Sequence, residues 1–411
     1  MSKQKTGPWK VLIAIVAGVV IGSMTPQGSQ LINIYHVGSS LFINALMLLV
    51  VPLVASSIIT GVARIGADQS FGRLGAKTFA AFLGTNLLAI LTGALFVNLF
   101  HPGAFIQAGV QIADISAIQQ IAEKNTLSFS HLLLQIVPSN IFSALSQGQM
   151  LGIIFFSIVF GFCVAKIDKS NASVINQFTL GVFEVMLQFT HLIMKVLPLG
   201  VFLLVAKVFA EFGLQSLHSL GWFTLTVVLG FLTFALVVLP LLLKFIAGVS
   251  PIKHIKNMGA ALITAFSTSS SAATLPVTLD CLEQKSGVSN KISSLVIPLG
   301  TSMNLAGSAL YMCVASLFVA QAYGIDLTLT TQFMIIVLAF MLTLGVAGVP
   351  SSSLVAIIAI LHAIGIPAEG IGLFIAVDRI LDMCRTTVSV FTGSCSAVLV
   401  ARSEGEKTHL L

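Results

Sequence analysis

The sequence predicts an all-α membrane protein, and three observations support that prediction. Hydrophobic residues make up 56% of the 411 residues and charged residues only 8%, whereas a soluble domain has about 25% charged residues. Mean hydropathy is +1.03. Apolar stretches long enough to cross a hydrocarbon core of about 30 Å recur along the whole chain. So few charges could not cover a water-facing surface, which excludes a water-soluble globular domain.

Six apolar stretches predict helical spans. They cover approximately 9–24, 38–64, 75–100, 149–167, 178–211 and 217–248. Residues 1–24 superficially resemble a secretory signal, but many spans follow and no small-residue cleavage site is obvious, so we expect a retained first helix. The mixed segment 101–148 is expected to be an external loop with short helices.

The positive charges are arranged as in a membrane protein. The net charge of +6 does not indicate nucleic-acid binding, because the lysines and arginines gather before the first span and after the second, fourth, sixth and last. The alternate connections carry far fewer, and this positive-inside pattern predicts that both termini face the cytoplasm. The five cysteines form no CxxC pair and the eight histidines are dispersed, so the sequence indicates neither a disulfide framework nor a metal site.

After residue 250 the apolar segments are interrupted by polar runs. The segments are 252–286, interrupted at 267–271; 291–322, interrupted at 301–308; 330–367, interrupted at 348–353; and 369–402. One pattern therefore occurs twice: a hairpin-length segment with a Ser-rich middle, then a helix with polar residues at mid-depth. Such breaks must be buried in protein or line a cavity, and paired interruptions in two halves predict a transporter site between inverted repeats. The alternative, ordinary extramembrane loops, fits poorly with their few charges and long apolar flanks.

The last apolar segment contains four ionisable residues, Asp378, Arg379, Asp382 and Arg385. Spacings of four, three and four place Asp378, Asp382, Arg385 and Ser389 on one helical face. Each ionisable group at this depth costs about 2.5 to 3.5 kcal/mol even on insertion scales, so this face must point into a wet or paired interior. The face is expected to bind solute. The alternative is an internal ion-pair ladder, Asp378 with Arg379 or Asp382 with Arg385.

These charges predict a carrier for a small charged solute. An amino acid offers an ammonium and a carboxylate, which an Asp and an Arg match, and the guanidinium of Arg385 can bind a carboxylate through two hydrogen bonds. The Ser-rich runs can offer hydroxyl and N–H groups to a second carboxylate. Two carboxylate sites and one ammonium site describe an acidic amino acid. Glu184, Lys195 and Lys207 are expected to be interfacial or lipid-facing.

Four motifs in order identify a family. They are SSSAATLP at 269–276, NLAGS at 304–308, GVP at 348–350 and DMCRT at 382–386. With them the chain resembles the dicarboxylate/amino acid:cation symporters, the prokaryotic glutamate/aspartate transporter homologues. The resemblance covers nearly the whole chain and is strongest from residue 250 onward.

The resemblance implies a glutamate transporter fold with eight transmembrane helices and two re-entrant helical hairpins, assembled as a homotrimer in the prokaryotic plasma (inner) membrane. A scaffold domain would contain helices 1 and 2 (1–74) and helices 4 and 5 (149–211). A transport domain would slide like an elevator, with the second hairpin as its gate. Its parts would be helix 3 (75–100) and, within 217–411, helix 6, hairpin 1 (252–286), helix 7 (291–322), hairpin 2 (330–367) and helix 8 (369–402).

The resemblance also implies roles for individual residues. Asp382 would bind the substrate ammonium and Arg385 the side-chain carboxylate, and an arginine at 385 favours glutamate or aspartate over neutral amino acids. The pocket would be completed by Ser270, Ser271, Ser308, Val349 and Thr386, with Ser389 where the family usually has Asn.

The departures from the family pattern concern the coupling ion. Ala306 replaces an Asp that helps to bind sodium, and Gly393 and Ser394 stand where an acidic residue is common. The second hairpin has Ser351 and Ser353 where glycines are common, and Met312 replaces the proton-carrying Glu of animal relatives. The candidate coupling-ion ligands that remain are Thr85, Asn86, Gly300, Asn304 and Asp378. Losing two carboxylates favours protons over sodium as the coupling cation, with Asp378 or Asp382 as available acids.

Other classes of function stay open at this point. A C4-dicarboxylate or neutral amino acid symporter would share the same fold. A channel or membrane-embedded enzyme is a further alternative, although no His, Cys or Glu side chains pair suitably at depth for catalysis. We expect no organic cofactor and no nucleic-acid partner.

Overall fold

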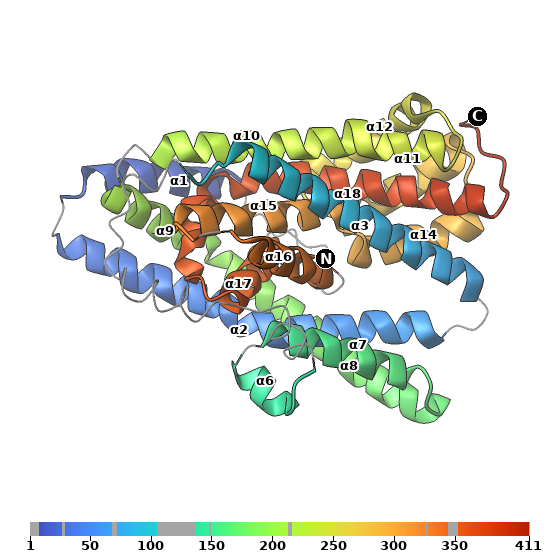
Figure 1. Cartoon of the computed structure of the whole chain (residues 1–411), viewed down its shortest axis with the longest axis horizontal. Coiled ribbons are helices and arrows are strands. Elements are labelled where there is room, and N and C mark those ends of the chain that lie inside the picture. Colours follow the sequence, from blue (N-terminus) through green and yellow to red (C-terminus); the bar gives the residue numbers. More distant parts are fainter. Residues whose placement is uncertain are drawn as a thin grey trace.

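The computed structural model describes residues 8–26, 29–67, 72–104, 137–147, 149–212, 216–325, 327–343 and 352–410. Over these residues the secondary structure is helical, with no strand, which confirms the predicted all-α class. Five of the helices are long and apolar enough to cross a membrane. Figure 1 shows most of the helices running along the long axis of the molecule.

One group of helices packs around the long helix α2. The group comprises α1 (Pro8–Met24), α2 (Gln30–Ala67), α7 (Met150–Val164), α8 (Lys169–Lys195) and α9 (Leu197–Phe212), beside the short α6 (Ile141–Gln147). Helix α1 packs on α9, and α2 packs on α7, α8 and α9. Gly22 permits the first contact, because a Cβ there would lie 2.6 Å from the carbonyl oxygen of Ala206.

A second group packs around α15, whose residues are all buried. The group comprises α3 (Gly72–Phe100), α10 (Ser216–Thr233), the π-helical η3 (Phe234–Val238), α11 (Leu239–Phe245), α12 (Pro251–Thr268), α13 (Ser271–Asp280), the π-helical η4 (Cys281–Lys285), α14 (Asn290–Met303), α15 (Ala306–Ala322), α16 (Leu329–Thr343), α17 (Ser352–Ala363), the 3-10 helix η5 (Ala368–Leu373) and α18 (Ile375–Ser403). Helix α15 contacts α3, α10, α16, α17 and α18, which makes it the centre of this group (Figure 1).

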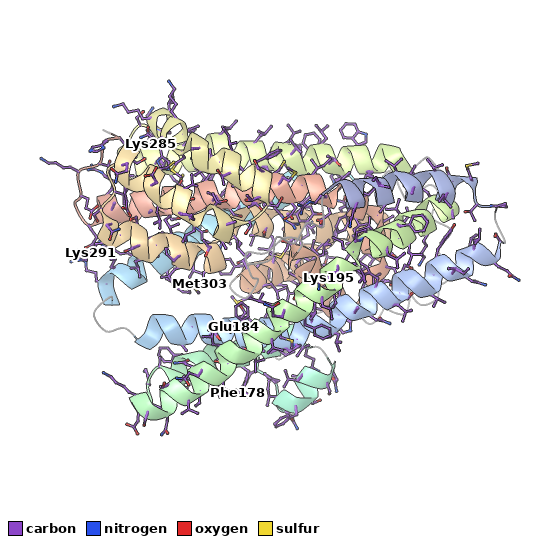
Figure 2. All side chains as sticks on the ribbon, turned by 180° about the vertical axis from the view of Figure 1, so that it is seen from behind. Phe178, Glu184, Lys195, Lys285, Lys291 and Met303 are labelled. Atoms are coloured by element: carbon purple, nitrogen blue, oxygen red, sulfur yellow. The ribbon has the colours of Figure 1, made fainter. Side chains whose placement is uncertain are left out.

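The span predicted at 178–211 is two helices rather than one. Helix α8 ends at Lys195 and α9 begins at Leu197, with a bend at Val196. Pro198 explains the break, because proline has no N–H to donate to the preceding turn and its ring crowds that turn. Figure 2 shows Glu184 and Lys195 along α8, and both are exposed.

The interrupted segments break where the polar runs predict. Between α12 and α13, Ser269 adopts a left-handed conformation with φ 49° and ψ 34°, and Ser270 Oγ accepts from the Ala273 N–H at 3.2 Å to cap α13. Helix 291–322 is broken at Asn304 and Leu305, between α14 and α15. Most of the polar run 348–353 lies outside the described residues.

The chain after α18 folds back on the base of the α12–α13 hairpin. Ser250 N donates to the Leu410 carbonyl at 2.9 Å, and His409 N donates to the Ser286 carbonyl at 3.0 Å. Arg402 Nε donates to the Ala247 carbonyl at 2.9 Å. The tail therefore holds both ends of the hairpin, and the last turn of α18 holds the chain just after α11.

Candidate functional site

The charged face of α18 is buried and paired within itself. Asp378, Asp382 and Arg385 are 4%, 2% and 2% exposed. The Arg385 guanidinium lies 2.7 Å from Asp382 Oδ1 through Nη2 and 3.3 Å from Asp378 Oδ1 through Nη1. Arg379 Nη1 lies 3.4 Å from Asp382 Oδ2. Two carboxylates and two guanidiniums thus cancel in charge, which is the condition for keeping them in a protein interior.

The structure contains one of the two ion pairs that the internal ion-pair alternative predicts. Asp382 pairs with Arg385, as that alternative expects. Asp378, however, pairs with Arg385 seven residues on rather than with its neighbour Arg379. Arg385 therefore bridges both carboxylates, and Arg379, whose side chain is 22% exposed, lies at the edge of the cluster.

Tyr311 is a member of this site that the sequence analysis missed. Its hydroxyl donates to Asp378 Oδ1 at 2.8 Å, and the Arg385 guanidinium carbon lies 4.9 Å from its ring centroid, within cation–π range. A tyrosine in the middle of the apolar span 291–322 was the available signal, because a buried phenol needs a partner for its hydroxyl.

The broken helix and α18 touch at Gly307. A Cβ at this position would lie 2.1 Å from the Arg385 carbonyl oxygen, so only glycine fits. The Gly307 N–H donates to Ser389 Oγ at 3.1 Å. This hydrogen bond satisfies an orphan N–H of the first turn of α15 and fixes Arg385 beside the break.

Three of the candidate coupling-ion residues meet at the break itself. Thr85 Oγ1 lies 3.2 Å from Asn304 Oδ1, and Asn86 Nδ2 donates to the Met303 carbonyl at 3.1 Å. Asn304 Nδ2 donates to Ser396 Oγ at 3.1 Å. Side chains of α3 and α18 thus bond to the groups exposed by the interruption, as a broken helix inside a membrane requires.

The hairpin tip faces the same region. A cavity of about 20 Å³, room for one water molecule, is lined on the hairpin side by Ser271 and Thr278, on α14 and its end by Ile297, Gly300, Thr301 and Asn304, and on α18 by Ser389, Val390 and Gly393. Its polar lining consists of hydroxyl, amide and backbone groups. No carboxylate lines this cavity, where the family resemblance would expect one near residue 393.

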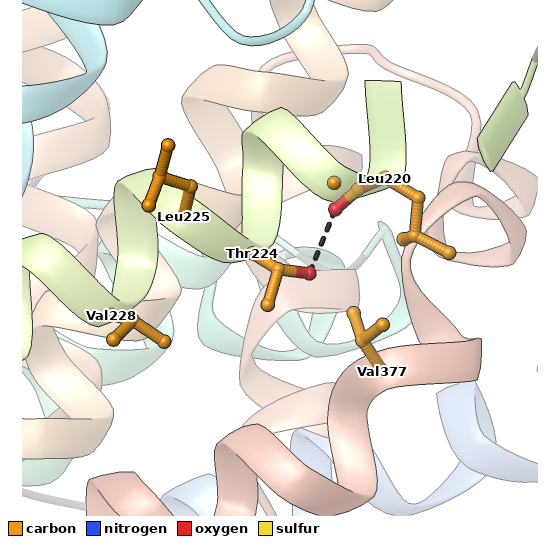
Figure 3. Close-up of a pocket in the computed structure, with 6 residues that line it drawn as sticks. Leu220, Thr224, Leu225, Val228 and Val377 are labelled. Carbon is orange, nitrogen blue, oxygen red and sulfur yellow. Dashed lines mark hydrogen bonds between the residues drawn. The ribbon is translucent and has the colours of Figure 1, made fainter. Parts of the chain in front are cut away.

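A larger cavity lies elsewhere and does not suit a charged solute. It measures about 480 Å³ and is lined by Leu220, Gly221, Thr224, Leu225, Val228 and Val377 (Figure 3). Its single hydroxyl, on Thr224, already donates to the Leu220 carbonyl at 2.7 Å. An apolar lining without a free donor or charge cannot recognise a carboxylate or an ammonium.

The other predicted site residues are distributed as follows. Ser308 and Thr386 are buried, and Thr386 Oγ1 donates to the Asp382 carbonyl at 2.8 Å. Asp378 lies in the charged cluster, far along α18 from the Thr85, Asn86 and Asn304 group. Val349 lies outside the described residues. No group of three His, Cys, Asp or Glu side chains capable of holding a metal ion occurs in the described part of the chain.

A buried, internally neutralised charge cluster beside a helix break, inside an all-helical apolar protein, is typical of a membrane transporter. Residues 8–403 match the model of the sodium:dicarboxylate symporter family. A proton/sodium-glutamate symport protein of Bacillus caldotenax is 37% identical over 400 residues, covering 97% of this chain and 94% of the relative. The chain belongs to the sodium:dicarboxylate symporter family.

Further relatives differ in the substrate that their names give. A proton/glutamate-aspartate symporter of Escherichia coli is 34% identical over 405 residues, 96% of this chain and 92% of the relative. A C4-dicarboxylate transport protein of Bacillus subtilis is 31% identical over 399 residues, 97% of this chain and 93% of the relative. With its membrane-length helices, this family member is a multi-pass membrane protein that carries a small molecule.

Proposed function

We propose that this chain is a secondary active symporter that imports L-glutamate or L-aspartate. Arg385, buried at 2% exposure and held by two carboxylates, is the observation that carries the proposal. The glutamate symporters of Bacillus caldotenax and Escherichia coli named above support it, because they resemble this chain over nearly its full length.

The substrate would bind by separating the ion pair of Asp382 and Arg385 and pairing with each of them. In the structure Asp382 and Arg385 neutralise each other. A zwitterion can replace that pair by two new ones, with its ammonium on Asp382 and its side-chain carboxylate on Arg385, so that no buried charge loses a partner. Ser270, Ser271, Ser308, Val349, Thr386 and Ser389 would complete the pocket, with hydroxyl and backbone groups for the second carboxylate. Because glutamate and aspartate carry one net negative charge, the occupied cluster would gain one negative charge, which a co-transported cation would balance.

The proposed coupling cation is the proton. Ala306 and Gly393 supply no carboxylate, and the oxygens around the 20 Å³ cavity come from neutral groups. Sodium sites in proteins are built from carboxylate and carbonyl oxygens, so losing two carboxylates lowers sodium affinity more than it affects a titratable proton site. Thr85, Asn86, Gly300 and Asn304 would then hold the broken helix in shape.

The proposed architecture follows the family resemblance. It has eight transmembrane helices and two re-entrant hairpins, α12–α13 and α16–α17, in a homotrimer in the prokaryotic inner membrane with both termini cytoplasmic. The α1, α2, α7, α8 and α9 group would be the scaffold, and the group around α15 would be the moving transport domain. The larger contacts of α2 with α7, α8 and α9, and of α15 with α3, α18 and α16, lie within the two groups and support this division.

Uptake into proteoliposomes tests the proposal. Labelled L-aspartate should accumulate under an inside-alkaline pH gradient without sodium, whereas strict dependence on sodium would contradict proton coupling. Unlabelled L-glutamate should compete with the label. Competition by succinate but not by glutamate would instead favour C4-dicarboxylate transport, the activity named for the Bacillus subtilis relative, and competition by serine would favour neutral amino acids.

A further inference from the structure

A histidine on the first hairpin is buried against the neutral part of α18. His254, on α12, is fully buried, and its ring stacks on Phe391 with centroids 5.7 Å apart. Its Nε2 lies 3.0 Å from Ser394 Oγ. Histidine changes charge near neutral pH more readily than other side chains, and this one has no place in the binding cluster described above.

The hydrogen bonds around Ser394 fix which ring nitrogen carries the proton. The Ser394 hydroxyl has a single hydrogen, which it donates to the Phe391 carbonyl at 2.7 Å. Ser394 Oγ must therefore accept from His254 Nε2, and Nε2 is the protonated nitrogen of the neutral ring. His254 Nδ1 is then a bare lone pair, and it has no hydrogen-bond partner among the described residues. A buried basic nitrogen that accepts no hydrogen bond from the described residues can bind one proton.

The His254 ring packs on the part of α18 where the family resemblance expects an acidic residue, near residue 393. Its partner Ser394 directly follows Gly393, which lines the 20 Å³ cavity with Ser271, Gly300 and Asn304. A change in the charge of His254 would therefore act on the part of α18 that lies beside the hairpin tip and the helix break. Toward the other side, the charged residues Lys253 and Lys256 are exposed, and they lie within about one helical turn of His254, roughly 5 Å along the axis.

No other ionisable group among the described residues hydrogen bonds to the His254 ring. The elements packed on α12 are α11, α13, η4 and α18, and their nearer ionisable groups are Lys244, Asp280, Glu283, Lys285, Cys395 and Arg402. None of these hydrogen bonds to the imidazole. Arg385 is nine residues from Ser394 along α18, about 13 Å. A proton on His254 would therefore add a full positive charge to an otherwise neutral interface, which is what makes its binding matter for the conformation.

We propose that Nδ1 of His254 binds the proton that is co-transported with the acidic amino acid. The inference rests on the proposed function and names its proton site. Protonation converts the neutral imidazole to imidazolium with both nitrogens as donors, and release of the same proton on the other side restores the lone pair. The ligand is a proton, taken from water and returned to water in each cycle.

The decisive experiment compares His254→Gln with the wild type in proteoliposomes. A glutamine amide can still donate to Ser394 but cannot titrate. Exchange of labelled for unlabelled aspartate at equal pH requires no net proton movement and should persist in the variant. Accumulation driven by an inside-alkaline gradient should fall at least about tenfold, the scale of an ordinary coupling free energy, and influx should lose its pH dependence. The matched control is His362→Gln at an exposed histidine, which should behave as wild type.

Each outcome bears on a different claim. Wild-type gradient-driven accumulation that His254→Gln fully retains overturns this inference and leaves the proposed function intact. Wild-type exchange driven only by sodium also overturns it. A wild type that exchanges no acidic amino acid overturns the proposed function and this inference with it. If His254→Gln fails to fold, Ser394→Ala decides, because it keeps the ring but removes the acceptor of Nε2. The pH midpoint of uptake should then shift, and an unchanged pH profile overturns the proposal.

Discussion

The two halves of α18 satisfy their buried polar side chains in different ways. In the first half, Asp378, Asp382 and Arg385 are charged and neutralise one another at 2.7 to 3.3 Å. In the second half, Ser389, Ser394 and Ser396 carry no charge and bond to an N–H, an imidazole and an amide from other helices. Both halves are buried, yet only the first stores charge. In the proposed function, substrate recognition uses the permanent charges of the first half, and the second half stays neutral until the coupling proton binds.

Removing the bridging charge should have the largest effect on the first half. Arg385→Cys leaves two carboxylates buried without their shared partner, and breaking such a pair costs about 3 to 5 kcal/mol. Acidic substrate uptake should be abolished, with neutral amino acids admitted instead. Uptake of labelled glutamate and of labelled serine measures both effects.

Arg379→Lys is the control for that variant, because it changes an arginine at the edge of the cluster and keeps the positive charge that pairs with Asp382. It should retain glutamate uptake. Unchanged glutamate affinity in Arg385→Cys would refute the assignment of the carboxylate site.

A methyl group at Gly307 should damage the joint between α15 and the charged half. The added Cβ would lie 2.1 Å from the Arg385 carbonyl oxygen, and overpacking of this kind costs about 1 to 3 kcal/mol. Gly307→Ala should therefore lower the thermal unfolding temperature and the affinity for glutamate. Gly393→Ala, in the neutral half, meets nothing within 4 Å and should leave the unfolding temperature near that of the wild type. Equal losses in the two variants would contradict the difference between the halves.

Tyr311→Phe should have a smaller effect, because it removes one hydrogen bond and keeps the ring under Arg385. A hydrogen bond to a charged group contributes about 1.5 to 3 kcal/mol to stability. Asp378 keeps its ion pair with Arg385 in this variant, so only part of that energy should reach the glutamate site, and glutamate affinity should fall by about tenfold or less. Tyr323→Phe, on the same stretch of chain but outside the cluster, is the control. Isothermal titration calorimetry of the purified protein with glutamate measures the change in affinity.

The smallest effect is expected at Glu404, beyond the end of α18. Its hydrogen bond to Lys77, aided by Arg73 at 3.5 Å, lowers the pKa of Glu404 below its usual range. A lowered folded-state pKa means that the contribution to stability is present at neutral pH and is lost as the pH falls through that lowered value. Glu404→Gln should thus differ slightly from wild type in unfolding temperature at pH 7 and converge with it in acid. A difference that grows toward low pH would contradict this.

The sequence predicted features that depend on local pattern. The all-α class, the breaks near Ser269 and Asn304 and the shared face of Asp378, Asp382 and Arg385 all follow from hydropathy and helical spacing. The split at Val196 was missed, because the apolar pattern continues across it and only Pro198 signals the bend.

Contacts between distant segments could not be predicted from pattern. Tyr311 lies 67 residues from Asp378 and His254 lies 140 residues from Ser394. Tyr311 looks like an isolated polar residue in an apolar helix, and His254 looks like one more polar residue in the first turns of α12. Which charge pairs with which also depends on rotamers and packing. Spacing alone offered Arg379 as a partner for Asp378, whereas Arg385 takes that role.

The tail after α18 has a consequence for movement. It bonds to Ser250 at the start of the first hairpin and to Ser286 at its end, while Arg402 bonds to the end of α11. Hydrogen bonds therefore join the base of the hairpin, the end of α11 and α18 to one another. In the proposed transport cycle, these three elements would therefore move together as one body.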